Sequence, residues 1–153
     1  MPLSTALLIA GAVVLLAVVA GVALRSQDGR RRSGGAARVH AEDLPGGLTA
    51  SASATLVQFS TELCARCPQM RRMLGEIATD RGIPHVEVDL TNRSDLATRY
   101  HVLQTPTTFL IDASGAVLSR WGGVPDRRSI EDAVTALPSV RNAVPTARRQ
   151  DQS

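Results

Sequence analysis

The chain has no lysine, few aromatic residues, and few cysteine and histidine residues. All 17 basic residues are arginine, which we interpret as a compositional bias rather than as chemistry. Aromatic residues make up only 3% of the chain, so a core must consist mainly of Val, Leu, Ile and Met. Only two cysteines and three histidines are present, and no histidine lies at ligand spacing to another, so no metal site is predicted. No glycine-rich phosphate loop, Ser/His/Asp set or pair of carboxylates stands out.

The formal net charge of +3 is small and unevenly distributed. Residues 44–140 contain nine arginines and ten acidic residues, whereas residues 1–43 contain five and three. Basic flanks around a nearly neutral domain are not the electrostatic footprint of a protein that binds nucleic acid. We therefore predict no nucleic-acid partner.

An apolar run near the N-terminus, Leu3 to Leu24, contains no charged residue. As a helix it would be roughly 33 Å long, which is close to the thickness of a bilayer's hydrocarbon core. A cleavable signal peptide is the alternative, but it would have a basic segment before a shorter apolar run. We predict an uncleaved, single-span transmembrane anchor over residues 1–25.

The segment after this run is rich in arginine and glycine, and residues 26–43 are predicted to form a flexible linker. By the positive-inside rule its arginines stay in the cytoplasm, which also places the globular domain there. Some anchors do not obey this rule, so the extracytoplasmic face is the alternative. The arginines can also contact anionic lipid headgroups.

The rest of the chain is long enough for one domain of about 100 residues. We place this domain at residues 44–140 and a polar tail, predicted to be disordered, at residues 141–153. Hydrophobic periodicity and turn residues predict the order β-α-β-α-β-β-α. The strands are expected at residues 55–60, 85–89, 107–112 and 116–121, and the helices at residues 64–81, at 94–100 and around 130–137.

Both cysteines lie in Cys64-Ala65-Arg66-Cys67, between a strand-like and a helix-like segment. This position would put the first sulfur at a helix N-terminus, where the N–H groups and the helix dipole stabilise a thiolate. The second sulfur, about one turn further on, can form a disulfide with the first. The pattern indicates reversible dithiol–disulfide chemistry. The alternative is two buried cysteines that pack as small hydrophobic residues, which fits poorly at a helix start.

Arg66 lies between the two cysteines. Its guanidinium would favour the thiolate and lower the pKa of Cys64, which would make the pair more oxidising. The alternative is a solvent-facing arginine whose effect on the sulfurs is screened.

The element order, Leu56-Val57-Gln58-Phe59, the two cysteines and Thr105-Pro106-Thr107 before a hairpin together resemble the thioredoxin family. The matching stretch runs from about Leu56 to Leu137. The resemblance implies an α/β, thioredoxin-like fold with a central mixed β-sheet flanked by helices, here joined to an N-terminal transmembrane helix. It also implies a protein disulfide oxidoreductase with a redox-active disulfide and a part in cell redox homeostasis.

Applied residue by residue, the resemblance implies that Cys64 is the more exposed, attacking cysteine and that Cys67 resolves the mixed disulfide. Pro106 is similar to the family's cis-proline, and the backbone of Thr105 would pair with an extended substrate segment. The alternative for Pro106 is an ordinary turn proline. No bound cofactor is implied. The expected partners are protein dithiol or disulfide substrates, an upstream thiol donor and the membrane.

Several positions depart from the family pattern. Leu63 stands where an aromatic residue often precedes the first cysteine, and Ala65-Arg66 replaces Gly-Pro. Gln58 occupies the position of a buried acid that helps to move the proton of the second thiol, and an amide does not titrate. Water or another acid then serves, or the transfer is slower. Glu62 is near in sequence but resembles a solvated loop charge.

Two other classes of function stay open. One is a thioredoxin-fold binding module with non-catalytic cysteines, in which the groove around Pro106 holds a partner. The other is a thiol metallochaperone, although Cys64 and Cys67 supply only two of the four ligands of a zinc site. The motif leaves reductant and oxidant open, and a cytoplasmic domain would favour the reductant.

Overall fold

The central strand of the domain leads directly into the cysteine pair. The computed structural model describes residues 3–27, 32–33, 37–49 and 51–137. Its strands form one sheet in the order β1-β5-β4-β2-β3. The bounds are Arg32–Ser33 for β1, Ala54–Ser60 for β2, His85–Asp89 for β3, Thr107–Asp112 for β4 and Val117–Gly122 for β5.

The sheet is mixed, as expected. β2 and β3 run parallel, whereas the pairs β2–β4, β4–β5 and β1–β5 are antiparallel. β1 is only two residues long, so four strands carry the fold. All seven residues of β2 are buried, which is typical of a strand that is covered on both faces.

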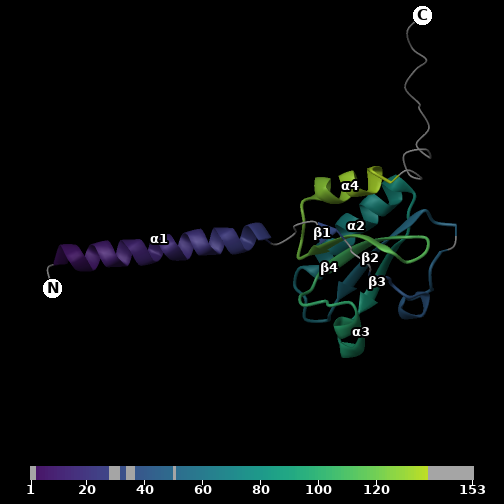
Figure 1. The fold of residues 1–153 in the computed structure, drawn as a ribbon, viewed down its shortest axis with the longest axis horizontal. Helices are drawn as coiled ribbons and strands as arrows, with labels where there is room; N and C mark the ends of the chain where they lie inside the picture. The colour runs from purple at the N-terminus through teal and green to yellow at the C-terminus, as the bar shows by residue number, and fades with distance from the viewer. Residues whose placement is uncertain (1–2, 28–31, 34–36, 50, 138–153) are drawn as a thin grey trace, which may run out of the picture.

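Helices cover both faces of this sheet. They are α2 (Cys67–Arg81), α3 (Ser94–Arg99) and α4 (Arg127–Thr135). Figure 1 shows α2 and α4 on one side of the sheet and α3 on the other. The structure therefore has the thioredoxin-like α/β architecture that the sequence predicts.

Side chains that alternate along β2 enter two separate cores, because successive residues of a strand point to opposite faces. Leu56 packs with α2 and α4, in a cluster that contains Trp121. Phe59 packs on the opposite face with Phe109 and Tyr100, whose rings lie 4.9 and 5.5 Å from it. Full burial of one such large apolar side chain contributes about 1.5–3 kcal/mol.

The domain begins earlier than residue 44. Within the expected linker of residues 26–43, both β1 and residues 37–39 pair with the sheet: the N–H of Val39 donates to the carbonyl of Gly115 at 2.8 Å, and Arg38 bridges to Ala116. Val39 is buried, which explains why this part of the chain packs on the domain. The tail expected at residues 141–153 lies outside the described residues.

The N-terminal apolar run forms the helix α1, Leu3–Gln27. The apolar side chains described on it, between Leu7 and Val22, are exposed. Among the residues that the structure describes, no helix meets the length and apolar character needed to cross a membrane. The structure thus shows the helix but not the transmembrane anchor expected at residues 1–25.

Candidate active site

The two cysteines form a disulfide in the structure. The sulfur atoms of Cys64 and Cys67 are bonded, and the Cα atoms lie 5.4 Å apart. Cys64 is partly exposed, whereas Cys67 is only 2% exposed. A thiolate from another molecule can therefore approach Cys64 more easily than Cys67.

A turn between β2 and α2 positions the first cysteine. The N–H of Cys64 donates to the carbonyl of Thr61, and the N–H of Cys67 donates to the carbonyl of Cys64. α2 begins at Cys67, with Arg66 as the residue before it. Cys64 thus precedes the helix, and the prediction that the helix begins at Cys64 was wrong. A physical reason is that Pro68 has no N–H group, so the bond to the carbonyl of Cys64 that would begin the helix there cannot form.

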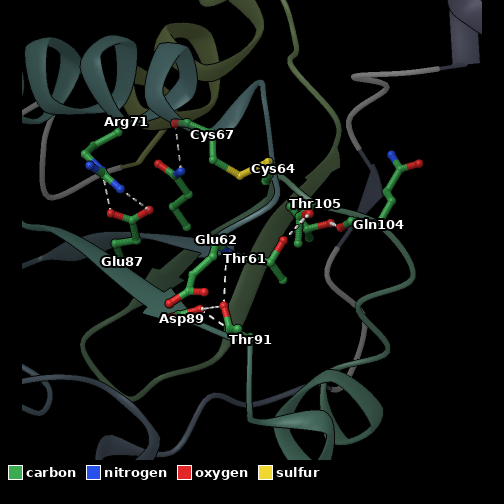
Figure 2. The surroundings of a disulfide bond; sticks show 12 residues. Thr61, Glu62, Cys64, Cys67, Arg71, Glu87, Asp89, Thr91, Gln104 and Thr105 are labelled. Carbon is green, nitrogen blue, oxygen red and sulfur yellow. Dashed lines mark hydrogen bonds and ion pairs between the residues drawn. A yellow bond between two sulfur atoms is a disulfide. The ribbon is translucent and has the colours of Figure 1, made fainter.

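The loop before β4 forms the other wall of the site. The peptide bond between Thr105 and Pro106 is cis, as the resemblance implied. The hydroxyl of Thr105 lies 3.3 Å from the hydroxyl of Thr61, which belongs to the turn that carries Cys64 (Figure 2). The N–H of Gly123 donates to the carbonyl of Pro106 at 2.7 Å and ties the loop to the end of β5. Thr105 and Pro106 are therefore held close to the turn that bears the disulfide.

Gln58 lies beneath the start of α2. Its side chain is fully buried, and its Nε2 donates to the carbonyl oxygen of Cys67 at 3.2 Å. In this chain the residue at the position that the family often fills with an acid is therefore an amide, and it contacts the backbone of the second cysteine.

Two acids lie near the site. Glu62 is exposed, and its backbone N–H donates to the hydroxyl of Thr91, which in turn donates to Asp89 (Figure 2). Glu87 lies opposite Gln58 on β3 and pairs with Arg71 of α2. Burial would raise the pKa of Glu87, but hydrogen bonds from Arg71 and Ser60 hold this pKa below its ordinary value of 4.5. A carboxylate with a lowered pKa is a poor acceptor for a thiol proton.

Two exposed leucines belong to the turn and the loop that form the site. Leu63, directly before Cys64, is 97% exposed, and Leu103, two residues before Thr105, is 94% exposed. They are the large hydrophobic residues exposed in the described part of the domain. Sequence reasoning missed Leu103, although an apolar residue in the loop before Thr-Pro was a usable signal.

The two remaining sequence predictions concern Arg66 and metal binding. Arg66 is exposed at the N-terminal end of α2, and its effect on Cys64 stays a prediction. Among the described residues, no group of three or more His, Cys, Asp or Glu side chains is placed to hold a metal ion.

Comparison with known families assigns the domain. The model of the thioredoxin family, described as "Thioredoxin", matches residues 37–136. This range covers more than half of the chain and begins at the segment before β2 that pairs with the β4–β5 hairpin. The chain belongs to the thioredoxin family. Family membership and the close pair of Cys64 and Cys67 together support a redox enzyme of the thiol–disulfide kind in general.

Similar solved structures include three thioredoxins. A mutant thioredoxin from Halobacterium salinarum is 20% identical, with a TM-score of 0.53, over 59% of this chain and 79% of that chain. Thioredoxin 1 from Thermosipho africanus is 16% identical, with a TM-score of 0.51, over 57% and 98%. Fasciola hepatica thioredoxin is 19% identical, with a TM-score of 0.50, over 57% and 84%. At such identities the likeness shows the fold alone. A comparison with curated proteins gives no match.

Proposed function

We propose that the chain is a membrane-anchored thiol–disulfide oxidoreductase that exchanges disulfides with protein substrates. The observation that carries the proposal is the unequal exposure of the two bonded cysteines beside the Thr105–Pro106 loop. An exposed sulfur can attack a large substrate, and a buried neighbour can act only on a bond that the first has already made. Cys64 is therefore the attacking cysteine and Cys67 the resolving one.

The exchange balances without a bound cofactor. In the dithiol form, the Cys64 thiolate attacks one sulfur of a substrate disulfide, which forms a mixed disulfide and releases the other sulfur as a thiolate. Cys67 then loses its proton and attacks the sulfur of Cys64, which releases the second substrate thiolate and forms the Cys64–Cys67 disulfide. Two electrons pass to the substrate, and an upstream dithiol protein restores the reduced pair. Run in reverse, the same steps oxidise a substrate.

The substrate segment lies along the loop that holds the cis-proline. The backbone of Thr105 pairs with an extended stretch of the substrate, and the exposed side chains of Leu63 and Leu103 favour a stretch with apolar residues. Burial of apolar area contributes about 25 cal/mol per Å². These leucines thus favour substrates in which an apolar segment is accessible, such as partly unfolded proteins.

α1 attaches the domain to a membrane in this proposal. A helix that is apolar on all sides needs an apolar environment, and the side chains described on α1 are exposed in the chain alone. The arginines that follow α1 favour a cytoplasmic domain, with the extracytoplasmic face as the alternative. Fractionation of cells that express the full chain tests this part, because an attached protein stays with the membranes after a wash with alkaline carbonate.

A trapping experiment tests the exchange. In the Cys67→Ser variant the mixed disulfide on Cys64 has no resolving thiol, so covalent complexes with substrates accumulate. Addition of a reductant should cleave these complexes and release the substrates. The matched control, Cys64→Ser, leaves only the buried sulfur and traps far less. Equal recovery of partners from both variants without a covalent bond would instead support a binding module.

A further inference from the structure

The buried amide of Gln58 has one satisfied end and one unsatisfied end. Its Nε2 donates to the carbonyl of Cys67, whereas its Oε1 is buried and has no hydrogen-bond partner among the described residues. A buried acceptor without a partner costs about 1–3 kcal/mol relative to one that is paired. Such an atom in the middle of the central strand therefore needs a reason.

The disulfide form lacks the donor that this oxygen could use. Cys67 is 2% exposed, and its sulfur carries no hydrogen while it is bonded to Cys64. Reduction gives this sulfur an S–H group, which is then a donor cut off from water. The side chain of Gln58 already contacts the backbone of Cys67 through Nε2. Its unpaired Oε1 is therefore a candidate acceptor for the S–H group of the same cysteine.

We propose that Gln58 is a redox-dependent positioning residue whose Oε1 accepts a hydrogen bond from the Cys67 thiol in the dithiol form. The bond forms when the disulfide is reduced and is lost when Cys67 gives up its proton to attack Cys64. Because an amide does not take up that proton and Cys67 is shielded from water, the proton passes to the substrate thiolate released in the first step. Gln58 thus stabilises the neutral thiol and favours the reduced pair.

A second buried oxygen provides the control. Thr108 lies directly opposite Gln58 on β4, and residues so paired share a face of the sheet. Its hydroxyl oxygen is also buried without a partner among the described residues. Thr108→Val removes this oxygen without changing the size of the side chain much. If Gln58 acted only as one buried polar group among others, both substitutions would have the same effect on the redox pair.

Infrared spectroscopy of the full chain in detergent tests the bond directly. The chain has two cysteines, so the S–H stretching band of the Cys64→Ser variant reports Cys67 alone. We expect this band at a lower frequency in Cys64→Ser than in Cys64→Ser/Gln58→Leu, with Cys64→Ser/Thr108→Val unchanged. A band that Gln58→Leu does not move, or that Thr108→Val moves as far, would overturn the proposal.

The equilibrium between disulfide and dithiol gives the second measurement. In glutathione buffers, Gln58→Leu is expected to shift this equilibrium toward the disulfide by about two- to tenfold, the value of one hydrogen bond. Thr108→Val is expected to shift it less than about twofold. Gln58→Met serves if the leucine variant does not fold, and an unchanged equilibrium in the folded variant would contradict the inference. The equilibrium measurement rests on the proposed function, whereas the S–H band does not. If the two cysteines never interconvert between disulfide and dithiol, the proposed function fails. The S–H band of Cys67 then still tests the hydrogen bond to Gln58.

Discussion

The carbonyl oxygen of Val39 lies 2.2 Å from the position that a Cβ on Gly115 would take. Gly115 also has a φ of +82°, in the left-handed region that favours glycine. These two residues form the hydrogen bond that joins the segment between β1 and β2 to the β4–β5 hairpin. The contact therefore leaves no room for any side chain at position 115.

Gly115→Ala is expected to destabilise the domain by about 1–3 kcal/mol or more, because backbone strain and the overlap with Val39 add together. Urea unfolding followed by circular dichroism measures this loss. Gly75→Ala is the matched control: it lies inside α2 with nothing within 4 Å of its new Cβ, and should stabilise by about 0.5–1 kcal/mol. Similar values for the two variants would show that Val39 and Gly115 do not restrict each other.

A carboxyl group ties the same N-terminal segment to α3. The side chain of Asp43 is 6% exposed and accepts hydrogen bonds from the hydroxyl of Tyr100 and from Arg99. Burial would raise the pKa of Asp43, but these two bonds hold this pKa below its ordinary value of 3.8. Between the folded and unfolded pKa values, the unfolded chain binds more protons than the folded one.

Asp43 therefore contributes stability that is fully present above about pH 3.8 and is lost as the pH falls through the folded pKa. Tyr100→Phe removes one of the bonds and should lower stability at neutral pH by about 1.5–3 kcal/mol. It should also flatten the decline in stability on acidification. Unfolding free energies at a series of pH values measure both effects, and a decline as steep as that of the parent chain would count against the role of Tyr100.

The elements and the cysteine pair could be predicted from sequence, because periodicity and motif spacing are local signals. The start of the domain could not, since the partner of Val39 is Gly115, far along the chain. Asp43 and Tyr100 are separated in the same way. The start of α2 was missed because Arg66 makes no side-chain capping bond that would mark it. The vacant oxygen of Gln58 depends on packing that no local pattern encodes.

The ion pair between Arg71 and Glu87 predicts that the pKa of Glu87 depends on Arg71. Arg71→Gln removes the guanidinium and its hydrogen bonds, while the partial burial of Glu87 remains. The pKa of Glu87 should therefore rise from its lowered value, as measured by NMR titration of the carboxyl carbon. Arg72→Gln removes the same charge one position further along α2 without removing the contact with Glu87. A pKa of Glu87 that responds equally to both variants would assign the shift to general charge rather than to the pair.

Trp121 is the single tryptophan of the chain and is fully buried on the face that carries α2 and α4. Its indole N–H donates to the hydroxyl of Ser129 on α4 at 3.0 Å. Trp121→Phe removes this bond and leaves a cavity, so we expect a loss of about 1–3 kcal/mol.

Ser129→Ala separates the two contributions to this loss. It removes only the acceptor and leaves the indole N–H buried without its partner, which should cost about 1 kcal/mol or more. Far-ultraviolet circular dichroism during urea unfolding suits both variants, because one of them lacks the tryptophan fluorophore. If Ser129→Ala leaves the unfolding free energy unchanged while Trp121→Phe lowers it as expected, packing of the indole and not its hydrogen bond holds α4 to the sheet. If the two losses are equal, the hydrogen bond accounts for the whole contribution of the indole.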